Sequence, residues 1–116
     1  MPKLKIAVIG CGHWGKNLVR NFSELGVLKY VCDSNIAHSQ EIAKKYNVES
    51  KSISELLKTD IDGVVIAAPA EQHYNIAKAS LEAEKHVFVE KPLSLKVIEA
   101  EKLCKLSTQR KKVLMV

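Results

Sequence analysis

The stretch VIGCGHWGKNL, residues 8–18, decides the fold of this chain. Its glycines Gly10, Gly12 and Gly15 have the spacing G-x-G-x-x-G. They follow a short apolar, β-branched run and precede a segment of helical periodicity, which is the context that a dinucleotide-binding turn requires. In such a turn the first glycine permits the bend, the second lets the backbone approach a pyrophosphate, and the third lets the helix pack on the strand. The N-terminus of the helix then offers the phosphates its N–H groups and the positive end of its dipole.

Strands and helices are predicted to alternate along the whole chain. The strands are expected at residues 4–9, 28–32, 63–68, 86–89 and 113–116, and the helices at residues 13–25, 36–46, 52–58, 72–83 and 94–110. The runs GVVIAA and HVFV are apolar throughout, as is typical of parallel strands covered on both faces. The order predicts an α/β fold: a Rossmann-like, doubly wound parallel sheet in three αβα layers, forming a single domain over residues 1–116.

Local signals define some helix ends and faces. Ser52 followed by Glu55 has the form of a capping box, and Ser94 is expected to cap the last helix. Apolar residues at steps of three to four predict the inward faces of the first two helices. These residues are Trp14, Leu18, Phe22 and Leu25 in the first helix, and Ile36, Ile42, Ala43 and Tyr46 in the second.

Composition excludes several classes of protein. The chain has 116 residues and a formal charge of +5, with lysines spread along it and one small basic cluster at residues 110–112. Few aromatic residues and scattered charge predict a solvated surface and no nucleic-acid partner. No segment has the length of a membrane span and no signal peptide is expected. The three cysteines lack metal-ligand spacing, so we expect no metal site and a reducing, cytoplasmic location.

Asp33 is the second residue that points to a dinucleotide. It lies 23 residues after Gly10, at the predicted end of the second strand. A carboxylate there can accept hydrogen bonds from the adenosine ribose hydroxyls and would repel a 2′-phosphate. Ser34 and its neighbours supply no arginine for such a phosphate, so the sequence predicts NAD rather than NADP. The alternative is an acid that only caps the next helix.

Two further segments follow the ends of central strands. Pro69 stops the strand at 63–68, and His73 comes shortly after it, either as a surface histidine or as part of a site. Glu90, Lys91 and Pro92 follow the strand at 86–89 and face the same crevice. The Glu-Lys pair is either a solvated pair or places a lysine that polarises a substrate hydroxyl. Pro92 rigidifies this backbone, and its peptide bond could be cis.

The segments GCGHWG, residues 10–15, and AAPAEQHYNIAKASLEAEKHVFVEKPLS, residues 67–94, closely resemble the nucleotide-binding domain of the glucose–fructose oxidoreductase family, which includes inositol dehydrogenases. The resemblance covers essentially the entire chain. It implies that Lys91 lies by the nicotinamide and the substrate hydroxyl and is catalytic, that Glu90 lies near the nicotinamide ribose, and that Pro69 and His73 line the crevice. The complete expected cofactor-binding set is Gly10, Gly12, His13, Trp14, Gly15, Asp33, Ser34, Ala68, Pro69, His73, Glu90 and Lys91.

The resemblance also implies a class of substrate and a second domain that this chain does not contain. The family transfers a hydride between a nicotinamide cofactor and a sugar or polyol alcohol. The stretch GHWGKNLVRNFSELG, residues 12–26, is similar to a smaller set that oxidises nucleotide-sugar uronic acids at C3. Family members continue into a second domain that supplies most substrate contacts and usually the interface of a homo-oligomer. That substrate domain is expected to be absent from this chain, which should bind dinucleotide without useful turnover.

Three alternatives remain open on the sequence. A stand-alone NAD-binding or sensing module would need the glycines and Asp33 but not Lys91. A nucleoside- or S-adenosylmethionine-binding domain would leave the EKP segment without a role. Cys11 and Cys32 are either small core residues or a redox pair at adjacent strand ends.

Overall fold

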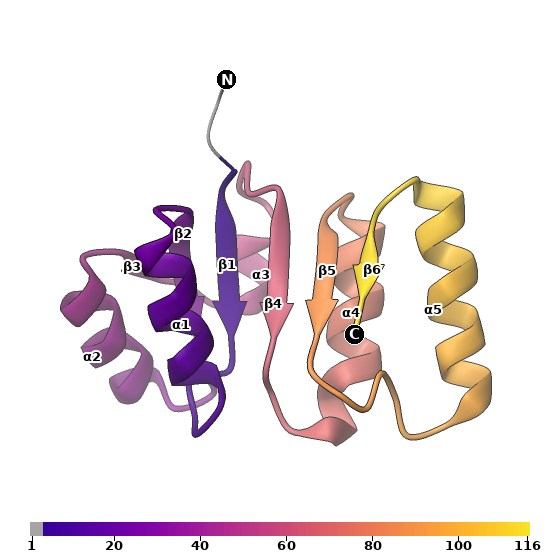
Figure 1. The fold of residues 1–116 in the computed structure, drawn as a ribbon, viewed down its shortest axis with the longest axis horizontal. Coiled ribbons are helices and arrows are strands. Elements are labelled where there is room, and N and C mark those ends of the chain that lie inside the picture. The colour runs from indigo at the N-terminus through magenta and orange to yellow at the C-terminus, as the bar shows by residue number, and fades with distance from the viewer. Residues whose placement is uncertain (1–3) are drawn as a thin grey trace.

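Six parallel strands form one sheet in the computed structural model, which describes residues 4–116 (Figure 1). The strands are β1 Ile6–Ile9, β2 Leu28–Cys32, β3 Glu49–Ser50, β4 Gly63–Ile66, β5 His86–Val89 and β6 Leu114–Met115. Their order in the sheet is β3-β2-β1-β4-β5-β6 and every neighbouring pair is parallel. This is the strand order of dinucleotide-binding Rossmann folds, so the predicted fold class is confirmed.

Five helices cover the two faces of the sheet. They are α1 Gly15–Glu24, α2 Ile36–Tyr46, α3 Ile53–Leu56, α4 Ala70–Glu82 and α5 Val97–Arg110. In Figure 1, α1 and α2 lie in front of the sheet, and α3 and α4 lie behind it. From β1 the chain adds β2 and β3 on one side of the sheet, and from β4 it adds β5 and β6 on the other side. The strand order therefore reverses between β1 and β4, the two central strands. Ligand crevices of open α/β sheets form at such a point, beyond the carboxyl ends of the strands.

The core divides into two layers, one on each face. Val8, Val31 and Val65 point toward α1 and α2, where they pack with Val19 and Ala43. The opposite layer joins the other strand side chains to α3, α4 and α5; its members include Ala7, Ile9, Val64, Ile66, Val87, Val89, Leu56, Ala77, Leu81 and Leu103. Because β4 is buried on both faces, its four residues are all apolar or glycine, as its sequence predicted.

Every predicted element forms with bounds within three residues of the prediction, and β2, α2 and β5 have the predicted residues. The two-residue strand β3 was not predicted, since so short a strand leaves no periodic signal. The capping box of Ser52 and Glu55 forms in full at the start of α3. The expected cap at Ser94 is wrong: Lys96 is the N-cap of α5, and the Ser94 hydroxyl donates to the Lys96 carbonyl instead.

Three residues predicted to face inward are exposed. Trp14 and Leu25 flank α1 as its N-cap and C-cap, where the chain is leaving the helical periodicity, and they are 65% and 69% exposed. Ile36 is the first residue of α2 and opens onto the pocket described below, with 67% of its surface exposed. No helix within residues 4–116 is both long enough and apolar enough to cross a bilayer.

Candidate dinucleotide site

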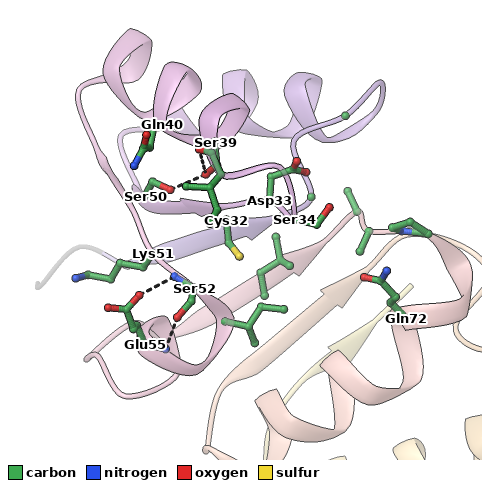
Figure 2. A pocket seen from close by; sticks show the side chains of 18 of the residues that line it. Cys32, Asp33, Ser34, Ser39, Gln40, Ser50, Lys51, Ser52, Glu55 and Gln72 are labelled. Carbon is green, nitrogen blue, oxygen red and sulfur yellow. Dashed lines mark hydrogen bonds between the residues drawn. The ribbon is translucent and has the colours of Figure 1, made fainter.

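A pocket with a volume of about 970 Å³ lies beyond the carboxyl ends of the central strands. Figure 2 shows Asp33 and Ser34 on one side of it and Gln72 on the other, with Ser50 and Ser52 at the far end. Eight residues of the expected set line the pocket: Gly10, Gly12, His13, Trp14, Asp33, Ser34, Ala68 and Pro69. The fold therefore brings together parts of the chain nearly 60 residues apart, at the place where Rossmann folds bind their ligand.

The three glycines of the turn occupy different environments. Gly10 has a φ of +96°, and a Cβ there would lie 2.6 Å from the carbonyl carbon of Ala67. A Cβ on Gly15 would lie 1.8 Å from the carbonyl oxygen of Gly10, so α1 can pack on the turn only without a side chain at this position. A Cβ on Gly12 would meet no atom within 4 Å, because this residue opens onto the pocket. Gly10 and Gly15 are thus required by the fold, and Gly12 leaves space for a ligand.

The N-terminus of α1 is open toward this space. Trp14 is its N-cap but supplies no side-chain hydrogen bond, and within residues 4–116 no acidic residue stands in the first turn of this helix. The positive end of the helix dipole is therefore not compensated by a side chain of its own first turn. Such an end favours an anionic group, and the pyrophosphate of a dinucleotide is one.

Asp33 holds the glycine turn as well as lining the pocket. Its Oδ1 accepts from the backbone N–H of Cys11 at 3.0 Å, and its Oδ2 accepts from the N–H of Asn35 at 3.0 Å. The alternative role as a helix cap is wrong, because Asn35 is the N-cap of α2 and its side chain accepts from His38 N–H. The carboxylate remains at the pocket wall, where it can accept further hydrogen bonds.

His38 completes this turn and was not expected from the sequence. Its Nε2 donates to the carbonyl oxygen of Cys11 at 2.7 Å. The Cys11 residue is therefore fixed at both of its backbone polar groups, by Asp33 at the N–H and by His38 at the carbonyl. The only sequence signal for His38 was its position three residues after the capping Asn35, which places it over the turn.

The cysteines near the pocket are buried thiols. Cys11 and Cys32 are 0% and 7% exposed, and the Cys11 thiol donates to the Cys32 carbonyl oxygen at 3.6 Å. Burial, with a smaller contribution from the Asp33 carboxylate, raises the pKa of Cys11 to about 12 and that of Cys32 to about 11. Reactive thiols have lowered pKa values and are accessible. All three cysteines of the chain are free, and these two behave as core residues, which argues against the redox pair.

The opposite wall of the pocket is built by the segment after β4. Ala68 and Pro69 lead into α4, and Gln72 of its first turn reaches the pocket. His73 points the other way. It is 2% exposed, so of the two roles left open for it the surface histidine is wrong. Its two ring nitrogens lie 2.7 Å from the carbonyl oxygens of Ala68 and Pro92.

The remaining expected residues lie at the margin of the pocket or behind it. Glu90 extends the pairing of β5, because its N–H donates to the carbonyl oxygen of Ile66 at 2.9 Å. Lys91 is exposed, and the peptide bond between Lys91 and Pro92 is cis. Gly15, His73, Glu90 and Lys91 are not among the residues that line the pocket.

Sequence reasoning missed much of the far end of the pocket. Ser39 and Gln40 of α2 and the residues from Ser50 to Glu55 line it there. Figure 2 shows the Ser39 and Ser50 hydroxyls facing one another, and they lie 2.6 Å apart. The capping box at 52–55 was the one available signal, since it marks the start of a helix beside this crevice.

Comparison with known protein families identifies the family of the chain. An oxidoreductase family with an NAD-binding Rossmann fold matches residues 4–116. The chain belongs to this family. As an NAD-binding Rossmann domain, it is related to sugar and polyol dehydrogenases, which confirms the resemblance found in the glycine turn and the EKP segment.

Two curated relatives of this family show how much of a longer protein the chain represents. It is 28% identical over 116 residues to UDP-N-acetylglucosamine 3-dehydrogenase of Acidithiobacillus ferrooxidans, covering 100% of this chain and 37% of the relative. It is 34% identical over 111 residues to inositol 2-dehydrogenase of Salmonella typhimurium, covering 84% of this chain and 33% of the relative. The chain thus spans about a third of the length of these relatives.

A solved structure of the family holds the expected cofactor. GenD2 from gentamicin A biosynthesis, in complex with NAD, superposes with a TM-score of 0.94 at 28% identity, covering 99% of this chain and 34% of that one. The pocket of this chain fits the same cofactor on its own geometry, with open space over Gly12, an uncompensated helix N-terminus and a carboxylate at the end of β2.

Proposed function

We propose that this chain is the cofactor-binding part of a dehydrogenase that acts on an alcohol of a sugar, a polyol or a nucleotide-linked sugar. The observation that carries the proposal is the joint placement of Gly12, the N-terminus of α1 and Asp33 around one pocket. In this proposal the glycine turn binds the pyrophosphate and Asp33 accepts from the adenosine ribose. NAD supplies the chemistry as the hydride acceptor when it is bound.

The proposal extends to the choice between NAD and NADP. Asp33 would repel a 2′-phosphate, and residues 34–36 supply no cation to offset it. Lys51 also lines the pocket, but its Nζ lies 3.5 Å from a carboxylate oxygen of Glu49, so its charge is already partnered. We therefore expect NADH to bind more tightly than NADPH.

Calorimetric titration of the chain with NADH and, separately, with NADPH tests this assignment. Asp33→Asn keeps the shape of the side chain and removes its charge, and it replaces one of the two oxygens that accept from the Cys11 and Asn35 N–H groups with an NH2 group. It should weaken NADH binding by about tenfold and reduce the preference over NADPH. Asp60→Asn is the matched control, because Asp60 is an exposed acid that precedes β4, at the opposite end of the sheet. Equal binding of both cofactors by the unmodified chain would contradict the assigned role of Asp33.

We assign the catalytic role to Lys91. It is exposed and is the second residue after Val89, the end of β5 that faces the crevice. Its ammonium can donate a hydrogen bond to the oxygen of a substrate hydroxyl. This bond polarises the hydroxyl and so assists the transfer of its proton. Glu90 is assigned to the nicotinamide ribose on the resemblance of the EKP segment. These roles require a substrate-binding region. The two curated relatives are about three times as long as this chain, which is long enough to include one.

The chain alone should therefore bind NADH without turnover. Hydride transfer needs the substrate carbon held against the nicotinamide, and we propose that most of the groups that hold it belong to a second domain. Assays of the 116-residue chain with NAD and either inositol or UDP-N-acetylglucosamine measure this. Turnover by this chain at a rate typical of dehydrogenases would contradict the proposed second domain. If the chain is instead a stand-alone binding module, a longer protein that contains it would also be inactive.

Location and assembly complete the proposal. Three free cysteines favour a reducing, cytoplasmic compartment. Exposed apolar side chains gather near the start of α5 and on β6 and the residues beside it: Leu95, Val97, Ile98, Val113, Met115 and Val116. Such a surface favours contact with another domain or another copy, and we propose a homo-oligomer for the whole enzyme. Light scattering over a range of concentrations would detect self-association of the chain.

A further inference from the structure

His73 makes an arrangement of hydrogen bonds that differs from that of the other buried polar side chains. It lies in the first turns of α4 and is 2% exposed. Its Nδ1 is 2.7 Å from the carbonyl oxygen of Pro92, and its Nε2 is 2.7 Å from the carbonyl oxygen of Ala68. Both partners can only accept, so both contacts are hydrogen bonds only if both ring nitrogens carry a proton.

His86 shows the opposite arrangement in the same sheet. Its Nδ1 accepts from the backbone N–H of Val113 at 2.9 Å, so that nitrogen carries a lone pair. A neutral imidazole satisfies this contact, whereas at His73 it would leave one nitrogen lone pair facing a carbonyl oxygen at 2.7 Å. Burial of the ring and the N-terminus of α4 both disfavour a cation, so the two carbonyl groups have to outweigh both effects.

The two carbonyl groups belong to the two segments that matter for the proposed chemistry. Ala68 follows β4 and lines the dinucleotide pocket. Pro92 follows Lys91 beyond β5. In the described part of the chain, no other side chain hydrogen bonds to residues 91–93. The His73 ring therefore joins the Lys91 segment to the pocket wall, beside the Glu90 N–H bond to Ile66 and the packing of Leu93 on the core.

We propose that His73 is a positioning residue, a doubly protonated clamp that fixes the Lys91 segment against the nicotinamide end of the pocket. This inference rests on the proposed function for the role of Lys91 and the orientation of the cofactor. It replaces the expectation that His73 itself contacts the cofactor, because the ring is turned into the protein and both of its nitrogens are used.

The protonation of the ring can be measured without any cofactor. Nitrogen-15 NMR of the histidine rings at neutral pH should show two protonated nitrogens for His73. His86 is the internal reference and should show one protonated nitrogen and one bare nitrogen, with the bare one at Nδ1. A bare nitrogen at His73 would overturn the clamp as proposed. This result does not depend on whether the chain binds NADH.

A pair of variants tests the positioning role. His73→Asn retains one amide donor and cannot reach both carbonyl groups. It should speed amide hydrogen exchange at Glu90, whose N–H donates to the Ile66 carbonyl oxygen just before the Lys91 segment, without changing exchange in β1. Ser80→Ala is the matched control, because the buried Ser80 hydroxyl donates to Ile76 within the same helix and contacts neither segment. Faster exchange throughout the sheet in His73→Asn would indicate a role in stability alone.

Titrations with two probes distinguish effects at the two ends of the pocket. ADP tests the glycine turn and Asp33, and NADH adds the nicotinamide end. We expect His73→Asn to weaken NADH binding by about tenfold and to leave ADP binding within about twofold. Equal losses for both probes would overturn the positioning role. If the unmodified chain binds neither probe, the proposed function fails, while the NMR and exchange results still decide whether the clamp exists.

Discussion

On one side of the pocket, a carboxylate and an imidazole hold the backbone of Cys11; on the other, a buried imidazole holds two carbonyl groups from different segments. The first wall is built by Asp33 and His38 around the turn between β1 and α1. The second wall is built by the segment after β4, and His73 supports it from behind, between that segment and the one after β5. In the proposed function, the first wall fixes a turn that accepts the pyrophosphate, and the second fixes the position of Lys91.

The two walls also differ in how tightly the backbone is packed. At the glycine turn, added atoms would collide with main-chain atoms 1.8 Å and 2.6 Å away, so the conformation depends on the absence of side chains. At the second wall, one side chain that is present, His73, bonds to both segments. Substitutions should therefore act through steric overlap on the first wall and through lost hydrogen bonds on the second.

The largest expected effect is the loss of folding stability in Gly15→Ala. The new Cβ would lie 1.8 Å from the Gly10 carbonyl oxygen, and α1 would have to move away from the turn. We expect a loss of about 3 kcal/mol in the free energy of unfolding, measured by urea denaturation. Gly12→Ala is the matched control, because its Cβ meets no atom within 4 Å, and it should change stability by only about 0.5 kcal/mol.

The same pair separates folding from binding at this wall. Gly12→Ala should weaken NADH binding while the chain remains folded, since the methyl group would project into the space assigned to the pyrophosphate. If Gly12→Ala and Gly15→Ala destabilised the fold equally, the assignment of separate roles to these glycines would be wrong.

The second expected effect concerns alkaline pH and the two thiols of the first wall. The pKa of Cys11 is raised from 9.0 to about 12 and that of Cys32 from 9.0 to about 11, mainly by burial. The unfolded chain therefore releases these protons at lower pH than the folded chain. The stabilisation they contribute is complete below about pH 9 and is lost as the pH rises through the folded pKa values.

Urea denaturation between pH 8 and pH 10 measures this loss, which should be about 2 kcal/mol for the two thiols together. Tyrosines and lysines also titrate in this range, so the double variant Cys11→Ala with Cys32→Ala supplies the reference slope. The variant should lose less stability between the two pH values. Parallel pH profiles would show that the thiols ionise in the folded chain as easily as in the unfolded one.

The sequence predicted the first wall far better than the second. Gly10, Gly12, Gly15 and Asp33 form a motif whose parts lie on adjacent elements, so spacing alone placed them around one turn. His73 and Pro92 are 19 residues apart, and nothing in the pattern of α4 indicates that the ring reaches beyond the next strand. The fold class followed from alternating apolar segments, but Trp14 and Ile36 were misplaced because periodicity does not show where a helix ends or where a pocket opens.

The smallest expected effect is at His38, and it sharpens the contrast between the two histidines. His38 donates through Nε2 alone, to the Cys11 carbonyl oxygen, so a neutral ring is sufficient there, whereas His73 faces two acceptors. His38→Ala removes one hydrogen bond from a partly buried site while Asp33 still holds the Cys11 N–H. A single hydrogen bond of this kind contributes about 1 kcal/mol, so NADH binding should weaken by about fivefold.

Calorimetry with both ADP and NADH distinguishes this prediction from the one for His73. Because His38 supports the turn assigned to the pyrophosphate, His38→Ala should weaken both probes by the same factor, whereas His73→Asn should weaken NADH alone. His38→Gln retains a donor on a side chain of similar length and should recover part of the loss. If His38→Ala weakened only NADH, the Cys11 carbonyl contact would have no bearing on the phosphate turn, and the two walls would not divide the cofactor as proposed.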